Sequence, residues 1–386
     1  MDLLASFADF RRASSIVGLG LALMPRPAVS NTMYQQTNLV SDISGLATAT
    51  DPNLKNPWGV SFGPAGPFWV SDQVTNVATL YNGSSVVPLV VSMPPAASNP
   101  DGPTGQVFNS AGAGFGGNIF LFATLAGTIN GWNGGTSASV LATSTGAVYT
   151  GLAMATNPSG TFLYAANANG NIDVYDSSVH PTTVPGTFTD PNLPAGYRPY
   201  NIQNIGGKLY VAYSKGVGAG LGVVSEFDAN GNFLKEVIAA GGALNAPWGM
   251  VIAPTGFGTF SNDLLVGNFG NGEINAFDPT TGAFLGTLEG TNGNPLVNSG
   301  LWSLSVRTAG NFNLDAVYFT AGINGQQDGL FGSIAPSLVS PTPEPSTLLL
   351  CFSSGLMGLA RLTIRRRGNR RTACVPKASS PRLRRS

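Results

Sequence analysis

The clearest pattern of hydrophobic and polar positions runs from Pro247 to Leu288. Four short apolar runs are separated there by segments rich in Pro, Gly, Asn and Asp. These residue types preset φ or accept φ > 0, so each segment reverses the chain. The pattern predicts one antiparallel sheet, which is too small to be stable without other sheets to pack on. Its expected strands are residues 248–252, 264–268, 273–277 and 284–288.

Copies of this unit recur along the chain. Six similar openings lie 46 to 53 residues apart, at Pro57, Pro103, Gly151, Pro199, Pro247 and Gly300. This spacing is typical of four-stranded propeller blades. The second run of each copy is continuously apolar, as expected of a strand buried on both faces between neighbouring blades. The chain is therefore predicted to be an all-β protein, a six-bladed β-propeller with four-stranded antiparallel blades.

The sixth copy lacks an outer strand, because a Pro-rich segment follows residues 329–334 directly. Upstream of the first copy, residues 34–40 form a further strand that the first blade does not need. We expect this N-terminal strand to complete the sixth blade. That arrangement closes the ring and leaves no open sheet edge.

Composition agrees with this fold and narrows the choice of partners. The 386 residues include 51 Gly and 27 Pro, and only 10% are charged, as short strands with frequent turns require. The formal net charge of zero averages unlike segments, because residues 31–340 contain 16 Asp and Glu but only six Lys and Arg. An acidic body disfavours nucleic acid as a partner.

Residues for nucleophilic or thiolate chemistry are scarce. Both cysteines, Cys351 and Cys374, lie in the C-terminal segment, so the body has no disulfide and no thiolate metal site. The one histidine, His180, lies in a polar loop, and no Gly-x-Ser-x-Gly motif is present. We therefore assign no catalytic residue.

The N-terminal 30 residues resemble an export signal in their order of residue types. Arg11 and Arg12 precede an apolar run at residues 16–24, and small residues surround a cleavage point near Ser30. This order predicts a secretory signal peptide over residues 1–30, followed by the propeller over residues 31–337. The alternative is a disordered start of the chain.

The repeat unit resembles a known repeat type. Its opening Pro247-Trp248-Gly249, the later Asn271-Gly272 turn and the Phe277-Asp278 pair are similar to NHL-type repeats and, more loosely, to six-bladed lactonase-like propellers. Residues 34–334 look like a family of secreted bacterial propellers without an assigned activity. The resemblance implies a ligand site at one mouth of the central channel, where lactonase-like enzymes bind a divalent metal through carboxylate and amide oxygens.

Three polar residues that close second strands are the candidate ligands for Ca²⁺ or another divalent cation: Asp72, Asn167 and Asn268. The competing interpretation is that they form turns, because Asn and Asp at a recurring blade position bond to their own backbone. We favour the second interpretation and expect no cofactor.

Trp58, Trp248 and Trp302 open three of the first strands. Their rings would stack on sugars if they point into the channel mouth, and would fill the gaps between blades if they point sideways. We favour packing between blades.

The C-terminal residues 338–367 resemble a PEP-CTERM sorting signal. The signal comprises a motif, an apolar segment and a basic cluster: Pro343, Glu344, Pro345, Ser346 and Thr347, then residues 348–364, then Arg365, Arg366 and Arg367. The apolar segment predicts one C-terminal hydrophobic helix, transiently inserted in the membrane with the arginines on the cytoplasmic side. The alternative is an ordinary membrane anchor. Residues 368–386 form a basic tail that we expect to be disordered.

This resemblance implies an address and a processing partner. An exosortase-type enzyme would cleave at the motif and release the protein to the cell surface or extracellular matrix of a Gram-negative bacterium. Two functions stay open: a non-enzymatic surface or matrix protein that binds polysaccharide or protein, and a metal-dependent lactonase-like hydrolase. We favour the first. The long insertion between Asp176 and Arg198 is the largest departure from the repeat, so a local function is expected there.

Overall fold

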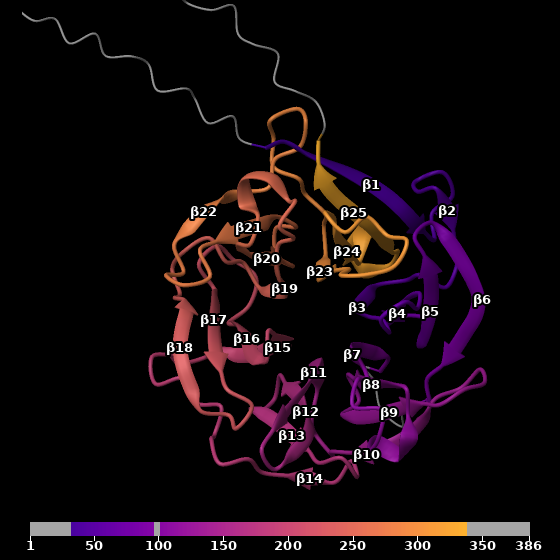
Figure 1. Ribbon diagram of the computed structural model, residues 1–386, viewed down its shortest axis with the longest axis vertical. Helices are drawn as coiled ribbons and strands as arrows, with labels where there is room; N and C mark the ends of the chain where they lie inside the picture. Colours follow the sequence, from indigo (N-terminus) through magenta and orange to yellow (C-terminus); the bar gives the residue numbers. More distant parts are fainter. Residues whose placement is uncertain (1–31, 96–100, 338–386) are drawn as a thin grey trace, which may run out of the picture. The chain divides into compact units, whose positions relative to one another are not determined.

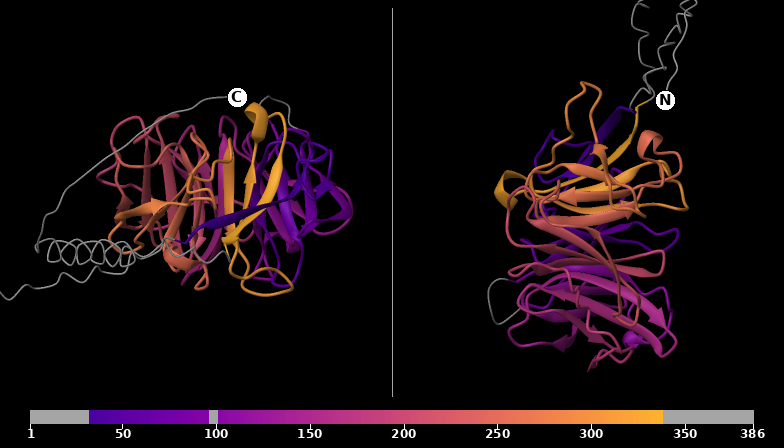
Figure 2. Two further views of the ribbon diagram at one scale, coloured as in Figure 1. Left: turned by 90° about the horizontal axis from the view of Figure 1, so that it is seen from above. Right: turned by 90° about the vertical axis from the view of Figure 1, so that its left-hand side faces the viewer.

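The computed structural model describes residues 32–95 and 101–337, which form six sheets arranged as blades in a ring (Figure 1). This confirms the six-bladed β-propeller with four-stranded antiparallel blades. In each blade the first strand lies nearest the centre of the ring and the fourth at the rim (Figure 1). Figure 2 shows the same blades from two further directions. We number the blades 1 to 6 in chain order.

The strand bounds lie close to those expected from the turn residues. Blade 1 contains β3 (Pro57–Ser61), β4 (Phe68–Asp72), β5 (Val77–Asn82) and β6 (Ser85–Ser92); blade 2 contains β7 (Pro103–Phe108), β8 (Phe120–Thr124), β9 (Thr128–Trp132) and β10 (Ser139–Thr143). Blade 3 contains β11 (Tyr149–Asn157), β12 (Gly160–Asn167), β13 (Ile172–Tyr175) and β14 (Pro181–Thr182); blade 4 contains β15 (Arg198–Ile205), β16 (Lys208–Ser214), β17 (Gly222–Phe227) and β18 (Phe233–Ile238). Blade 5 contains β19 (Pro247–Ile252), β20 (Leu264–Asn268), β21 (Ile274–Phe277) and β22 (Phe284–Thr287).

Blade 6 joins the two ends of the described chain. Its strands are β23 (Leu301–Val306), β24 (Val317–Ala321), β25 (Leu330–Pro336) and β1 (Tyr34–Ser41), with β2 (Ala49–Thr50) parallel to β1. Strand β1 pairs antiparallel with β25, from Tyr34 opposite Pro336 to Ser41 opposite Leu330. The expected closure of the ring by the N-terminal strand is confirmed.

Helical segments are short in the part of the chain that the structure describes. They are the 3-10 helices η1 (Phe115–Gly117) and η2 (Gly258–Phe260) and the single turn α1 (Ile323–Gln326). No helix within these residues is long and apolar enough to cross a membrane. The expected signal peptide, sorting motif, arginine cluster, C-terminal helix and tail lie outside the described residues, and their assignments stay predictions.

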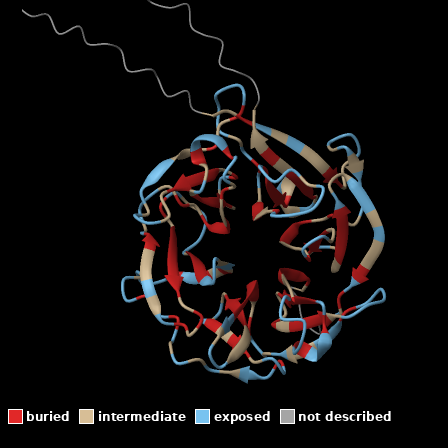
Figure 3. Ribbon diagram, in the orientation of Figure 1, coloured by how far each residue is buried: buried red, intermediate tan, exposed pale blue. Residues whose placement is uncertain are grey.

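The core consists of apolar side chains packed between blades. Among the described residues, six buried clusters each combine side chains of two neighbouring blades, for example Phe68 of β4 with Phe331 of β25. Every residue of β4, β8, β20 and β24 is buried (Figure 3). The continuously apolar second runs are therefore explained by burial on both faces, as the sequence predicts.

The first strands approach one another closely because a small residue follows their opening. A Cβ atom on Gly59 would lie 2.4 Å from the carbonyl oxygen of Thr104, and one on Gly105 would lie 2.2 Å from the Leu152 nitrogen. Only glycine leaves room for backbone at such distances. In blade 4 the position is Asn201, whose side-chain amide donates to the Trp248 carbonyl oxygen at 2.7 Å.

Candidate functional site: the central cavity

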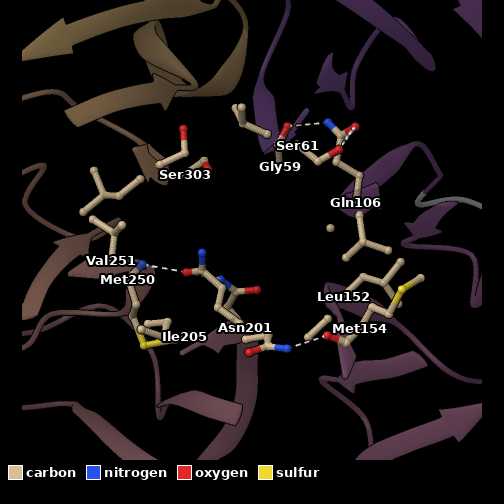
Figure 4. A pocket seen from close by; sticks show the side chains of 18 of the residues that line it. Gly59, Ser61, Gln106, Leu152, Met154, Asn201, Ile205, Met250, Val251 and Ser303 are labelled. Carbon is tan, nitrogen blue, oxygen red and sulfur yellow. Dashed lines mark hydrogen bonds between the residues drawn. The ribbon is translucent and has the colours of Figure 1, made fainter. Parts of the chain in front are cut away.

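All six first strands surround a cavity of about 500 Å³ at the centre of the ring (Figure 4). This volume lies in the usual range for small-molecule sites, roughly 300–1,000 Å³. The cavity walls come from the middle and end of each strand, so every blade contributes to them.

Aromatic rings close one end of the cavity. Trp58, Trp248 and Trp302 form a buried cluster against Tyr200 and Phe269; we call these five residues the aromatic plug. The rings of Trp58 and Trp302 stack with centroids 3.5 Å apart, and the ring of Trp248 stands edge-on to both. Trp248 also donates from Nε1 to the carbonyl oxygen of Thr150 in blade 3, at 2.9 Å. The plug therefore spans several blades at the end where the first strands begin.

The positions of the tryptophans differ from the prediction. We expected Trp58, Trp248 and Trp302 to fill gaps between blades, but they meet one another in a separate cluster contributed by three blades. They are only 5%, 3% and 1% exposed, so they present no open face on which a sugar could stack. The reason is that each tryptophan lies beside the residue at which neighbouring first strands come closest, and its side chain points toward the middle of the ring. Bulky rings fill the space that the backbones leave there.

The other end of the cavity is open. In β7, β19 and β23 the first four residues are buried and the last two are half-buried. In these three strands the side chains thus become more exposed with increasing distance from the aromatic plug. The cavity is a one-ended pocket that opens on the face formed by the loops after the first strands.

The described side chains that line the cavity are uncharged. Their apolar members include Leu152, Met154, Ile205, Met250 and Val251, and their polar members are Ser61, Gln106, Asn201, Gln203, Asn204, Ser110, Ser303 and Ser305. Figure 4 shows apolar side chains of blade 3 and blade 5 reaching the same space. The lining can therefore bury an apolar surface while offering amide and hydroxyl groups for orientation.

Hydrogen bonds hold the polar lining in fixed positions. Gln106 donates from Nε2 to the carbonyl oxygens of Gly59 at 2.7 Å and Trp69 at 2.9 Å, and its Oε1 accepts from Ser61 Oγ at 3.1 Å. Gln203 Oε1 accepts from the Met250 backbone nitrogen at 2.6 Å. These bonds cross between neighbouring blades, so the amide groups are oriented before any ligand arrives.

One polar group of the lining is buried without a partner among the described residues, and Gln203 has a further group that makes no hydrogen bond there. The Ser305 hydroxyl is buried without a hydrogen bond, and Gln203 uses only its carbonyl oxygen. A buried polar group without a partner is costly unless water or a ligand satisfies it. These groups are available to orient a ligand.

The cationic side chain of Arg307, which is next to the cavity lining in sequence, is turned into the gap between blades. Arg307 directly follows the lining residue Val306, yet its guanidinium lies 4.1 Å from the ring centroids of Phe62 and Phe312 and donates to the Gly66 carbonyl oxygen at 3.1 Å. Burial lowers the pKa of Arg307. Strand alternation explains why Arg307 points away from the cavity that Val306 lines, since successive side chains point to opposite faces.

The candidate metal ligands lie in three different blades, at the ends of β4, β12 and β20, and are not among the lining residues. Asn268 accepts from the Asn245 backbone nitrogen and donates to the Ala243 carbonyl oxygen, and Asn167 accepts from the Val148 nitrogen. Each asparagine thus fastens the loop that enters its own blade.

Asp72 is fully buried and accepts from Thr79 Oγ1 at 2.7 Å. Burial raises its pKa well above the usual range for an aspartate, and the charge of Asp51 adds to the effect. Within residues 32–95 and 101–337, no three His, Cys, Asp or Glu side chains gather as a metal site.

Sequence reasoning did not identify the cavity-lining residues Gln106, Asn201, Gln203 and Met250. A signal was present, because they lie at the position of closest backbone approach in β7, β15 and β19, or one or two residues after it. The prediction instead chose polar residues that recur at the ends of second strands. The residue types that line the cavity differ from blade to blade, so they form no repeating pattern.

Comparison with known proteins adds relatives but no activity. No family model matches the chain. The uncharacterised protein R648 of Acanthamoeba polyphaga mimivirus is 33% identical over 346 residues, which cover 82% of this chain and 83% of the relative. A second protein of the same virus, the uncharacterised protein L690, is 32% identical over 346 residues, which cover 82% of this chain and 88% of that relative. This chain belongs to the family of these mimivirus proteins.

Both of these relatives are viral proteins, whereas the sequence patterns predict a bacterial secreted protein. A bacterial origin therefore stays a prediction. Among solved structures, a streptogramin B lyase is 12% identical and superposes with a TM-score of 0.50. The match covers 81% of this chain and 100% of the lyase chain. That likeness supports the propeller fold alone.

Proposed function

We propose that this member of the mimivirus family is a non-enzymatic binding propeller whose central cavity takes an uncharged, partly apolar ligand. The observation that carries the proposal is the neutral lining of a one-ended pocket. A charged ligand would lose its hydration there without gaining a paired charge, which is unfavourable. An uncharged ligand loses less and gains contact with Leu152, Met154 and Ile205.

The lining also favours binding over hydrolysis. A lactonase-like mechanism needs carboxylates or imidazoles near the substrate to hold a metal or move a proton. The described lining supplies amides, hydroxyls and apolar side chains instead. These groups orient a ligand and exclude water, which is sufficient for recognition.

We further propose that the protein is exported and acts at a cell surface or in an extracellular matrix. The support is sequence-based: the basic and apolar order of residues 1–30 and the PEP-CTERM-like residues 338–367. An exosortase-type enzyme would be the processing partner. Changing Pro343 and Glu344 to alanine is expected to keep the chain attached to membranes, as measured by fractionation of cells that express an exosortase.

Tryptophan fluorescence provides a direct test of the cavity. Trp248 lines the cavity floor, so a bound ligand is expected to shift the emission of the full-length protein. The titration compares uncharged peptides and neutral oligosaccharides with charged versions of each. We expect the uncharged ligands alone to produce a saturable shift.

A matched pair of variants localises the binding. Val251 is half-buried in the cavity wall, and Val217 is 62% exposed and is not a lining residue. Val251→Lys places a charge in the cavity and is expected to weaken binding at least about tenfold, whereas Val217→Lys leaves it unchanged. Equal binding by both variants, or a saturable shift with charged ligands only, would overturn the proposal.

A further inference from the structure

The insertion after blade 3 is fastened onto blade 4 rather than left as a free loop. The backbone nitrogens of Gly186 and Phe188 donate to the carbonyl oxygens of Asn230 and Gly231, at 2.6 and 3.0 Å. A Cβ atom on Gly186 would lie 2.2 Å from the carbonyl carbon of Gly231. The insertion and the β17–β18 turn therefore meet backbone to backbone, which fixes their relative position.

Aromatic packing continues this attachment into the core. The ring of Phe188 lies 5.5 Å from Tyr164 of blade 3 and 5.4 Å from Phe227 of blade 4. Phe188 is buried although its φ of +52° is unusual for a residue with a side chain. The insertion thus spans the junction of two blades and holds a defined conformation there.

The insertion delivers a carboxylate into this junction. Asp190 is 6% exposed, and its Oδ2 accepts from Ser225 Oγ of β17 at 2.6 Å. Its Oδ1 accepts from the backbone nitrogen of Asn192 at 2.7 Å. Each oxygen keeps a lone pair, because a carboxylate has about four acceptor positions.

A second cavity of about 170 Å³ lies at this junction. The walls come from the start of β13, the insertion, the start of β15 and Tyr213 at the end of β16. Its polar members include Asp190, Tyr213 and Arg198, and its apolar members include Ile172, Phe188 and Leu193. An engineered cavity of about 150 Å³ holds one benzene ring, so this cavity has space for a single six-membered ring.

One wall residue has an unused polar group. Tyr213 is 3% exposed, and its hydroxyl is buried without a hydrogen-bond partner among the described residues. The hydroxyl can donate one bond and accept two. Tyr197, by contrast, donates its hydroxyl proton to the Gly220 carbonyl oxygen at 3.2 Å. Tyr213 is therefore the group that a ligand in this cavity would satisfy.

We propose that the cavity between blades 3 and 4 binds one ring of an uncharged sugar. Asp190 accepts from sugar hydroxyls, Tyr213 exchanges a hydrogen bond with them, and exposed Arg198 donates at the entrance. Phe188, Leu193 and Ile172 contact the C–H surfaces of the ring. This site is separate from the central cavity, and the inference does not rest on the function proposed for that cavity.

The charges of the lining favour a neutral ligand over an ion. A carboxylate ligand would be attracted by Arg198 but would meet the buried charge of Asp190. An ammonium ligand would be attracted by Asp190 but would meet Arg198. A polyhydroxyl ring benefits from both groups, since hydroxyls donate to the carboxylate and accept from the guanidinium.

Saturation-transfer NMR on the full-length protein tests the proposal with methyl glycosides of glucose, galactose and mannose. Acetate and ethylammonium serve as the anionic and cationic comparison ligands. At least one methyl glycoside is expected to show saturable transfer. Tyr213→Phe removes only the hydroxyl and is expected to weaken that binding about tenfold, as the loss of a hydrogen bond to a buried site implies.

Further variants separate this site from others. Asp190→Asn is expected to weaken binding, and Tyr318→Phe in blade 6 is the matched control that leaves it unchanged. Binding that Tyr213→Phe and Asp190→Asn do not weaken would overturn the proposal. Transfer to acetate or ethylammonium but to none of the sugars would also overturn it.

Discussion

The first strands come closest to one another at a single backbone position in each blade. In blade 5 this position is Gly249, where a Cβ atom would lie 2.5 Å from the Trp302 carbonyl oxygen and 2.6 Å from the Leu304 nitrogen. Both neighbours are backbone atoms, so neither can rotate away. Space at this one residue therefore determines how tightly the ring packs around its axis.

Gly249→Ala is expected to lower the free energy of unfolding by about 1–3 kcal/mol, because the added methyl forces neighbouring backbones apart. Gly242→Ala is the matched control, since its nearest neighbour would lie 4.0 Å away. Urea denaturation measures both. Equal midpoints for the two variants would show that the ring tolerates the methyl group.

Asp72 gives a prediction about pH. Burial raises its pKa in the native state, so the native chain keeps a proton that the unfolded chain releases above about pH 4. Its contribution to stability is complete below the unfolded pKa and is lost as pH rises toward the native pKa. Asp72→Asn is expected to remove this loss and to be more stable than the wild type at neutral pH, as measured by urea denaturation from pH 4 to 8.

Asp278 provides a control of opposite sign. It is half-buried, and backbone hydrogen bonds from Thr281 and Thr280 hold its pKa below the usual value. Asp278→Asn is therefore expected to lose stability above the unfolded pKa, whereas Asp72→Asn gains it. An identical pH dependence of Asp72→Asn and wild-type protein would contradict the assignment.

At the scale of elements, ring closure depends on β1. Tyr34 is 1% exposed, packs its ring on Phe257 with centroids 4.7 Å apart, and donates its hydroxyl proton to the Phe257 carbonyl oxygen at 3.0 Å. The strand that completes blade 6 is thereby also fastened to blade 5. One aromatic side chain thus joins the N-terminal strand to blade 5.

Tyr34→Ala is expected to cost about 3–5 kcal/mol of unfolding free energy, as for other buried aromatic residues changed to alanine. Gln35→Ala, an exposed position on the same strand, is expected to have little effect. Thermal unfolding followed by circular dichroism compares them. If the two variants unfold at the same temperature, the Tyr34 side chain does not stabilise ring closure as we infer.

At the scale of the whole molecule, the aromatic plug connects blades that are not neighbours in sequence. Trp302 contacts rings of blades 1, 4 and 5 and donates from Nε1 to Asn56 Oδ1 at 2.9 Å. The plug makes one end of the ring solid and confines the central cavity to the other end.

Trp302→Ala is expected to cost about 3–5 kcal/mol and to remove the near-ultraviolet circular dichroism that arises from the stacked Trp58–Trp302 pair. Trp132→Ala, at a half-buried position in blade 2, is expected to cost less and to keep that signal. Retention of the signal in Trp302→Ala would contradict stacking in solution.

Much of the architecture follows from local sequence. Turn residues and two-residue alternation act within a few positions, so they determine the strand ends, as the match of residues 264–268 with β20 shows. The recurrence of the unit determines the number of blades, and the missing outer strand of blade 6 determines the role of residues 34–40. These inferences need no knowledge of how blades face one another.

The tertiary structure alone decided where side chains meet. Alternation places Trp248 on one side of its strand, but only the ring geometry shows that this side faces Trp58 and Trp302 rather than a gap between blades. Likewise, Asp190 meets Ser225, 35 residues further along the chain, because the insertion crosses to the next blade. Strand patterns are set by neighbours in sequence, whereas both cavities are formed by residues that only packing brings together.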